Sequence, residues 1–135
     1  RKGYEAAMAA HGLHSRVYDG GRFTPEGREC ARRMIAEEAP PEAILVASDR
    51  VFVGMLSYFV ETGVGVPRDI AAGIIGLPIF EDGMYPRVDR VVWEDGAAEK
   101  AAVPLLLERI QNLELPVRRV VTPSSVVEAE FLVDG

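Results

Sequence analysis

The chain has 135 residues, 48% hydrophobic and 27% charged, which is enough for one domain with a buried core. Its formal net charge is −6, with acids and bases interspersed, and this argues against a surface that grips a phosphate backbone. No run reaches the ~18 apolar residues of a membrane span, no signal peptide is visible, and a single cysteine, Cys30, excludes an internal disulfide.

The first third of the chain is predicted to hold two helices. Residues 1–11 open in helical rhythm without an initiator methionine, which indicates a fragment of a longer protein. Residues 15–19 are predicted to form a short strand. Thr24 as an N-cap and Pro25 at the first helical position predict a second helix over 24–38.

The centre of the chain reads as strand, helix and strand. Residues 43–47 are an apolar run of strand length, and Ser48 and Asp49 then break it and supply an N-cap. Apolar side chains recur at helical spacing up to Gly63, a plausible left-handed C′ residue. A second buried-strand run covers residues 70–75. Such a βαβ unit builds a parallel sheet that is buried on both faces.

The last part of the chain continues the alternation. An irregular apolar loop over 76–86 is followed by a strand over 88–93 and a helix over 95–112. Pro104 lies inside that helix and is expected to kink or break it. Two extended segments end the chain, over residues 117–122 and 125–133. The predicted class is α/β, three-layer, with a mainly parallel sheet flanked by helices.

Short motifs follow one another along nearly the whole chain in an order typical of one family. They are Gly3-Tyr4 with Ala6, Ala7 and Met8; Phe23-Thr24 with Gly27; AILVASD…G…ETGVGVPRDIAAG from Ala43; Tyr85-Pro86 with Val88; Ala101-Ala102 with residues 105–107; and Pro123 to Val127. This set resembles the effector-binding domain of the LacI/GalR transcriptional regulators. The resemblance implies a Rossmann-like subdomain of a type I periplasmic-binding-protein-like fold.

The resemblance also implies a division of the chain. Residues 1–87 and 117–135 would form the C-terminal subdomain. Residues 88–116 would supply a crossover strand and a helix of the N-terminal subdomain. A helix-turn-helix domain that binds DNA would lie upstream, outside this chain.

A ligand site is expected at the strand tips, because open parallel sheets bind ligands beyond the carboxyl ends of their strands. The resemblance implies that Ser48 and Asp49 contact an effector, often a sugar or purine, that Phe23 stacks on its apolar face, and that Trp93 lies at a ligand position. The alternatives are that Asp49 only caps its helix, that Phe23 packs in the core, and that Trp93 packs at a hinge or interface.

Two positions depart from the family pattern. The family's effector-binding Arg falls one residue before Arg1, so its role is not carried to this chain. Gly76 is the fifth residue assigned to the ligand site by the resemblance, but it stands where the family has an Asp that could bind paired sugar hydroxyls. Either the ligand is not a typical sugar or the protein responds to something else.

A dimer interface is the second expectation. The family dimerises through the helix that contains Phe52 and Val53 and through the loop that contains Phe80, Met84 and Tyr85, and clustered aromatics and Met are common at interfaces. The alternative is that the loop side chains fold back on their own core.

The sequence gives little support for catalysis. His11 and His14 lack a clear third metal ligand, and no convergent acid–base set is visible, so neither an enzyme nor a metal or cofactor is predicted. The predicted function is the effector-sensing and dimerisation region of a cytoplasmic LacI/GalR-like regulator that binds a sugar-like or nucleobase-like molecule. The alternative is half of a solute-binding protein of a transport system.

Overall fold

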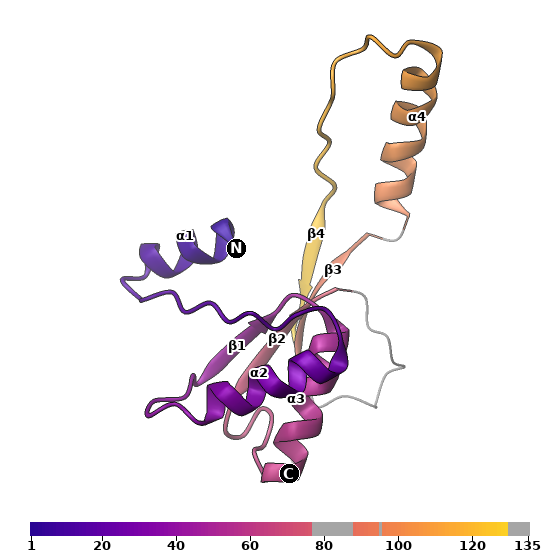
Figure 1. Cartoon of the computed structure of the whole chain (residues 1–135). Coiled ribbons are helices and arrows are strands. Elements are labelled where there is room, and N and C mark those ends of the chain that lie inside the picture. The colour runs from indigo at the N-terminus through magenta and orange to yellow at the C-terminus, as the bar shows by residue number, and fades with distance from the viewer. Residues whose placement is uncertain (77–87, 95, 130–135) are drawn as a thin grey trace, which may run out of the picture.

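The computed structural model describes residues 1–76, 88–94 and 96–129. Figure 1 shows a sheet with the helices over residues 24–35 and 49–62 packed beside it, while the N-terminal helix lies to one side and the helix over residues 97–111 stands apart on the chain that links two strands. The elements are α1 (Lys2–Ala10), α2 (Thr24–Ile35), β1 (Ala43–Val46), α3 (Asp49–Thr62), β2 (Ala71–Ile75), β3 (Asp89–Trp93), α4 (Ala97–Gln111) and β4 (Ser124–Val127).

Within the described ranges, four strands form one sheet in the order β1-β2-β3-β4. β1 pairs with β2 and β2 with β3 in parallel, with Ala43 opposite Ala71 and Gly73 opposite Asp89. β4 returns from α4 and therefore runs antiparallel to β3. The predicted class, an α/β fold with a mainly parallel sheet flanked by helices, is confirmed.

The central βαβ unit forms where the sequence predicts it. Gly63 ends α3 with φ of 75°, a left-handed conformation that glycine adopts without steric cost. The N–H of Val64 donates to the Phe59 carbonyl at 2.9 Å and that of Gly63 to the Val60 carbonyl at 3.3 Å. These two bonds satisfy carbonyls that the end of a helix otherwise leaves unpaired.

The core lies between α3, α2 and one face of the sheet. Phe52, Phe59 and Met34 are its largest fully buried side chains, and Val46 and Ile74 join them from β1 and β2. Burial of apolar side chains of this size stabilises the fold by about 1.5–3 kcal/mol each.

Residues 15–19 do not form the predicted strand. The N–H of Arg16 donates to the Tyr4 hydroxyl at 3.1 Å, and the Arg16 guanidinium donates to the Ala39 carbonyl at 2.9 Å and to the Glu37 carboxylate. Side chains and a loop therefore hold this extended segment, and no strand of the described sheet pairs with it. Residues 117–122 are likewise extended without strand pairing in the described sheet.

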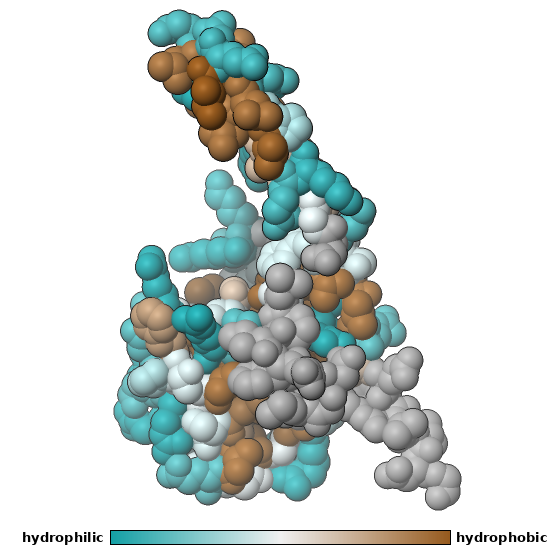
Figure 2. Space-filling view, turned by 90° about the vertical axis from the view of Figure 1, so that its right-hand side faces the viewer, coloured by the Kyte–Doolittle hydropathy of each residue, from teal (hydrophilic) through white to brown (hydrophobic). Residues whose placement is uncertain are grey.

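The helix α4 continues through Pro104, so the residue does not break the helix. Pro104 deprives only the Lys100 carbonyl of its helical partner, and both residues are exposed, so water can satisfy that carbonyl. α4 contains no buried residue. Figure 2 shows its apolar surface as a brown area at the top of the molecule, to which Val103, Leu106, Leu107 and Ile110 contribute side chains more than half exposed.

Among the described residues, no helix is long and apolar enough to cross a membrane.

Candidate ligand site at the carboxyl edge of the sheet

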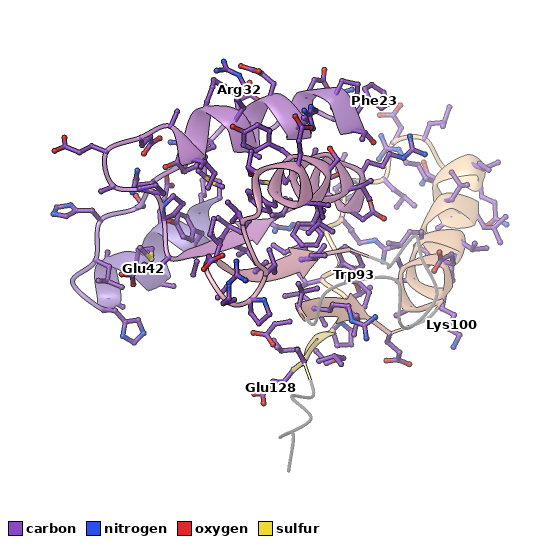
Figure 3. All side chains as sticks on the ribbon, turned by 90° about the horizontal axis from the view of Figure 1, so that it is seen from below. Phe23, Arg32, Glu42, Trp93, Lys100 and Glu128 are labelled. Carbon is purple, nitrogen blue, oxygen red and sulfur yellow. The ribbon has the colours of Figure 1, made fainter. Side chains whose placement is uncertain are left out.

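Four of the five residues predicted to contact a ligand follow or end parallel strands. Ser48 and Asp49 come two and three residues after β1, Gly76 comes directly after β2, and Trp93 is the last residue of β3. Because these strands run parallel, their carboxyl ends meet at one edge of the sheet. The fifth residue, Phe23, precedes α2, and Figure 3 labels it on the same side of the molecule as Trp93.

Ser48 and Asp49 both serve the start of α3. Ser48 is the N-cap, and its hydroxyl accepts the Val51 N–H at 3.5 Å, a long hydrogen bond. Asp49 is the first helical residue rather than a cap, and its Oδ1 accepts the Arg50 N–H at 2.8 Å. The cap is thus the hydroxyl and not the carboxylate, because the Ser48 backbone is extended (φ −153°) as a cap requires. Both side chains remain half-buried.

Phe23 is 54% exposed, so it is not the core residue of the alternative interpretation. It is the N-cap of α2, one residue before the predicted cap, Thr24. The shift has a local cause. A phenyl ring offers no acceptor, but the Glu26 carboxylate reaches back and accepts the Phe23 N–H at 2.7 Å, half of a capping box.

Trp93 and Gly76 lie at the same edge. Trp93 is 43% exposed at the end of β3. Gly76 donates its N–H to the Val91 carbonyl at 3.3 Å, and a Cβ built on it would meet nothing within 4 Å. Its φ of 151° is one that other residues rarely adopt. A side chain is therefore missing here because of backbone conformation rather than crowding.

Two carboxylates next to Phe23, those of Glu26 and Asp19, were not predicted as part of the ligand site. Glu26 Oε2 also accepts the Arg22 N–H at 2.8 Å, and Asp19 Oδ1 accepts the Gly21 N–H at 3.0 Å. The N–H groups of Arg22 and then Phe23 lower the pKa of Glu26, because they favour the charged carboxylate. The sequence signal that could have indicated the role of Glu26 is an acid three residues after the N-cap of a helix.

The VPRDI turn lies at the opposite edge, just before β2. Asp69 accepts the Gly65 N–H at 2.6 Å and pairs with Arg68 at 2.7 Å, while Arg68 donates to the Gly63 carbonyl at 2.9 Å. The Arg68 guanidinium, and then the Gly65 N–H, lower the pKa of Asp69 to about 2. This part of the family motif closes a turn and does not face the candidate ligand site.

The residues predicted at the dimer interface differ in how far their side chains are exposed. Phe52 is fully buried in the core, so its side chain offers no surface to a partner. Val53, the next residue on α3, is half-buried, and Val60 on the same helix is 80% exposed. The loop residues Phe80, Met84 and Tyr85 lie outside the described residues.

The remaining candidates, a metal site, a reactive thiol and a cavity, do not add to the ligand site at this edge. Across residues 1–76, 88–94 and 96–129, no three His, Cys, Asp or Glu side chains gather as a metal site would require. Cys30 is buried, and desolvation raises the pKa of its thiol. A cavity of about 340 Å³ lies between α4 and the segment that follows it, lined by Leu105, Leu106, Arg109, Leu115, Pro116, Val117 and Arg118. None of the predicted ligand residues lines it.

The sequence of residues 1–129 matches the family described as the periplasmic binding protein-like domain. Among curated proteins, the chain is 29% identical over 114 residues to the HTH-type transcriptional repressor PurR of Haemophilus influenzae (strain PittEE), covering 79% of the chain and 33% of PurR. It is 30% identical over 103 residues to the HTH-type transcriptional repressor MelR of Bacillus subtilis (strain 168), covering 76% of the chain and 29% of MelR.

The fold is also close to solved structures. A LacI transcriptional regulator from a Rhodococcus species superposes with a TM-score of 0.82 at 26% identity, over 96% of this chain and 48% of that one. The chain spans about a third of the length of the curated relatives it matches.

Proposed function

This chain belongs to the periplasmic binding protein-like domain family and, within it, to the LacI/GalR transcriptional regulators, and we propose that it senses a small molecule and modulates DNA binding. It does so as an effector-binding and dimerisation region. DNA is bound through a helix-turn-helix domain outside this chain, and the protein acts in the cytoplasm as a homodimer. The chain's relatives are named as transcriptional repressors, and its proposed role is binding rather than catalysis.

One observation supports the proposal: Ser48, Asp49 and Trp93 follow or end parallel strands at the carboxyl edge of the sheet. Ser48 and Asp49 offer hydroxyl and carboxylate oxygens, both half-buried, beyond the end of β1. Phe23 and Trp93 offer exposed aromatic surface. Small-molecule sites commonly combine apolar walls with a few polar groups that fix orientation. The ligand is therefore a compact molecule with a flat or apolar face and hydrogen-bonding groups, sugar-like or nucleobase-like.

The proposed division of the chain rests on α4. Residues 1–87 and 117–135 form one subdomain, and residues 88–116 supply a crossover and a helix of another. Two features support this division. α4 stands apart from α2, α3 and β1 in Figure 1 and has no buried residue. Its apolar side chains are of the kind that a second subdomain covers.

The proposed mechanism follows from this arrangement. A ligand bound at the carboxyl edge of one subdomain also contacts the second subdomain when the two are closed around it. Because the ligand contacts both subdomains only in the closed arrangement, it favours that arrangement. The equilibrium between arrangements shifts by its differential affinity. In a homodimer this changes the spacing of the DNA-binding domains. The dimer surface is proposed at the exposed side of α3 near Val53, together with the loop that contains Phe80, Met84 and Tyr85.

A thermal-shift screen of the full-length protein with sugars, nucleobases and sugar phosphates tests the proposal. A compound present at 100 times its Kd stabilises the folded state by about 2.7 kcal/mol. Binding should weaken in Phe23→Ala and Asp49→Asn but not in Glu114→Gln, a control on an exposed residue beyond α4. If no compound changes the melting temperature and the Ser48→Ala and Asp49→Ala variants respond on DNA like the wild type, the site assignment is wrong.

A further inference from the structure

The turn before α2 holds its exposed aromatic residue by an unusual number of local hydrogen bonds. Three successive backbone N–H groups, those of Gly21, Arg22 and Phe23, all donate to side-chain carboxylates. Exposed turns commonly leave such groups to water. Here both of the last two bonds end on one atom, Glu26 Oε2, at 2.8 and 2.7 Å.

We infer that Glu26 is a positioning residue, which fixes the turn so that the Phe23 ring is presented to a ligand before the ligand arrives. The inference rests on the proposed function in one respect only, the assignment of Phe23 to the ligand site. Preorganised contacts bind more tightly because the ordering cost does not fall on the binding step.

The glycine before this turn fits the same role. Gly21 has φ of 66°, a conformation that side chains disfavour. A Cβ built on Gly21 would lie 2.5 Å from the Glu26 Cβ and 2.6 Å from its Cδ, closer than non-bonded carbon atoms approach. The absence of a side chain at position 21 therefore gives the Glu26 carboxylate room to fold back onto the turn.

Neighbouring groups hold the turn from its other end. The Arg33 guanidinium donates to the Asp19 carbonyl at 3.0 Å, and the Phe23 carbonyl accepts the Gly27 N–H at 3.1 Å. The turn is thus tied to α2 at both ends, and Glu26 supplies the bonds in between.

An acid that only stabilised the helix would not need to accept hydrogen bonds from the Arg22 and Phe23 N–H groups, as Glu26 does. Glu29 lies one turn further along α2 and is also exposed, but among the described residues its carboxylate pairs with the Arg32 and Arg33 side chains and not with the turn. Glu29 thus offers a matched control that has the same charge and the same helix but does not touch the turn.

Hydrogen–deuterium exchange of the full-length protein, resolved to single amides and run without ligand, tests the inference. In Glu26→Ala the Arg22 and Phe23 amides should exchange about tenfold faster or more. Glu26→Gln should restore most of the protection because its amide oxygen also accepts, and Gly21→Ala should loosen the same two amides by crowding Glu26. The α2 amides after residue 28 should stay within about twofold, and Glu29→Ala should leave the turn unchanged.

The inference is overturned if Glu26→Ala leaves both amides as slow as in the wild type, or if Glu29→Ala accelerates them equally. A separate arm measures binding of adenine, D-ribose and D-glucose to Phe23→Ala and Glu26→Ala. If the Arg22 and Phe23 amides exchange faster in Glu26→Ala but Phe23→Ala binds every compound as the wild type does, Glu26 still holds the turn. The proposal that the turn presents Phe23 to a ligand is then overturned. That result would also remove Phe23 from the proposed function.

Discussion

Gly27 of α2 and Gly54 of α3 make reciprocal close contacts across the interface of the two helices. A Cβ built on Gly27 would overlap the Val51 carbonyl oxygen of α3, and one built on Gly54 would overlap the Thr24 carbonyl oxygen of α2. Each glycine thus lies directly on the backbone of the opposite helix. The spacing of α2 and α3, and with it the place of the turn that carries Phe23, depends on both.

Adding a methyl group at this contact should destabilise the protein. Gly54→Ala and Gly27→Ala force the helices apart against backbone atoms that cannot move aside, at a cost of about 1–3 kcal/mol. Gly3→Ala is the control. Its Cβ would meet nothing within 4 Å, and alanine favours the helix by up to about 1 kcal/mol. Urea unfolding measures all three, and a Gly54→Ala variant as stable as wild type would contradict the observed contact.

Acid should weaken the turn closed by Asp69. Its pKa in the folded state is about 2, below the ordinary 3.8. A depressed carboxyl pKa stabilises the fold above the unfolded-state pKa, and that contribution is lost as the pH falls from about 4 to about 2. Asp69→Asn should lower the melting temperature at pH 7 and flatten its decline over this window. Equal slopes for Asp69→Asn and wild type would show that the pair contributes nothing to acid stability.

Cys30 should be unreactive while the protein is folded. It is 3% exposed, and its raised pKa reduces the reactive thiolate form. Its reaction with a thiol reagent should be slower than in denaturant by about 100-fold or more, because it requires opening of the helix layer. Labelling is followed by absorbance at increasing urea concentrations. Rapid labelling in buffer would mean that α2 detaches readily.

Ser48 should reveal whether its hydroxyl acts only as a cap. Ser48→Ala should cost about 0.5–1 kcal/mol, the low end for caps because the observed bond is long. Ser48→Asn retains a capping oxygen and should be nearly neutral. If the hydroxyl also contacts a ligand, both variants should lose part of the ligand-induced thermal shift.

Short sequence patterns correctly predicted the segments whose structure depends on a few neighbouring residues. Gly63 ended α3 as expected, since only the backbone conformation of one residue was at stake. The start of α2 was misplaced by one residue, because Glu26 satisfies the Phe23 N–H and so makes an aromatic residue the N-cap. Residues 15–19 have a strand-like composition, but pairing requires a neighbouring strand, which composition cannot reveal.

The candidate site was predicted less completely for a similar reason. The strand tips follow from the order of elements, so Ser48 and Asp49 could be placed at the carboxyl edge. The helical spacing of Phe52, Met55 and Phe59 already put Phe52 on the apolar stripe of its helix, and only the family resemblance assigned it to the dimer surface. Packing turns Phe52 into the core and leaves Val53 half-buried. The contacts of Glu26 depend on side-chain torsions that periodicity does not describe.

β3 pairs with β2 only as far as Val91, so its last two pairs with β4, Val92–Ser125 and Trp93–Ser124, extend beyond β2 as a short two-stranded ribbon at the base of α4. Ribbons of two strands twist more readily than wide sheets. α4 has 15 residues and is therefore about 22 Å long. A change of about 10° in the direction of the α4 axis at its base would displace the far end of α4 by about 4 Å. A small change in the direction of α4 at its base, near the Trp93 end of β3, would thus become a larger displacement at the far end of the helix.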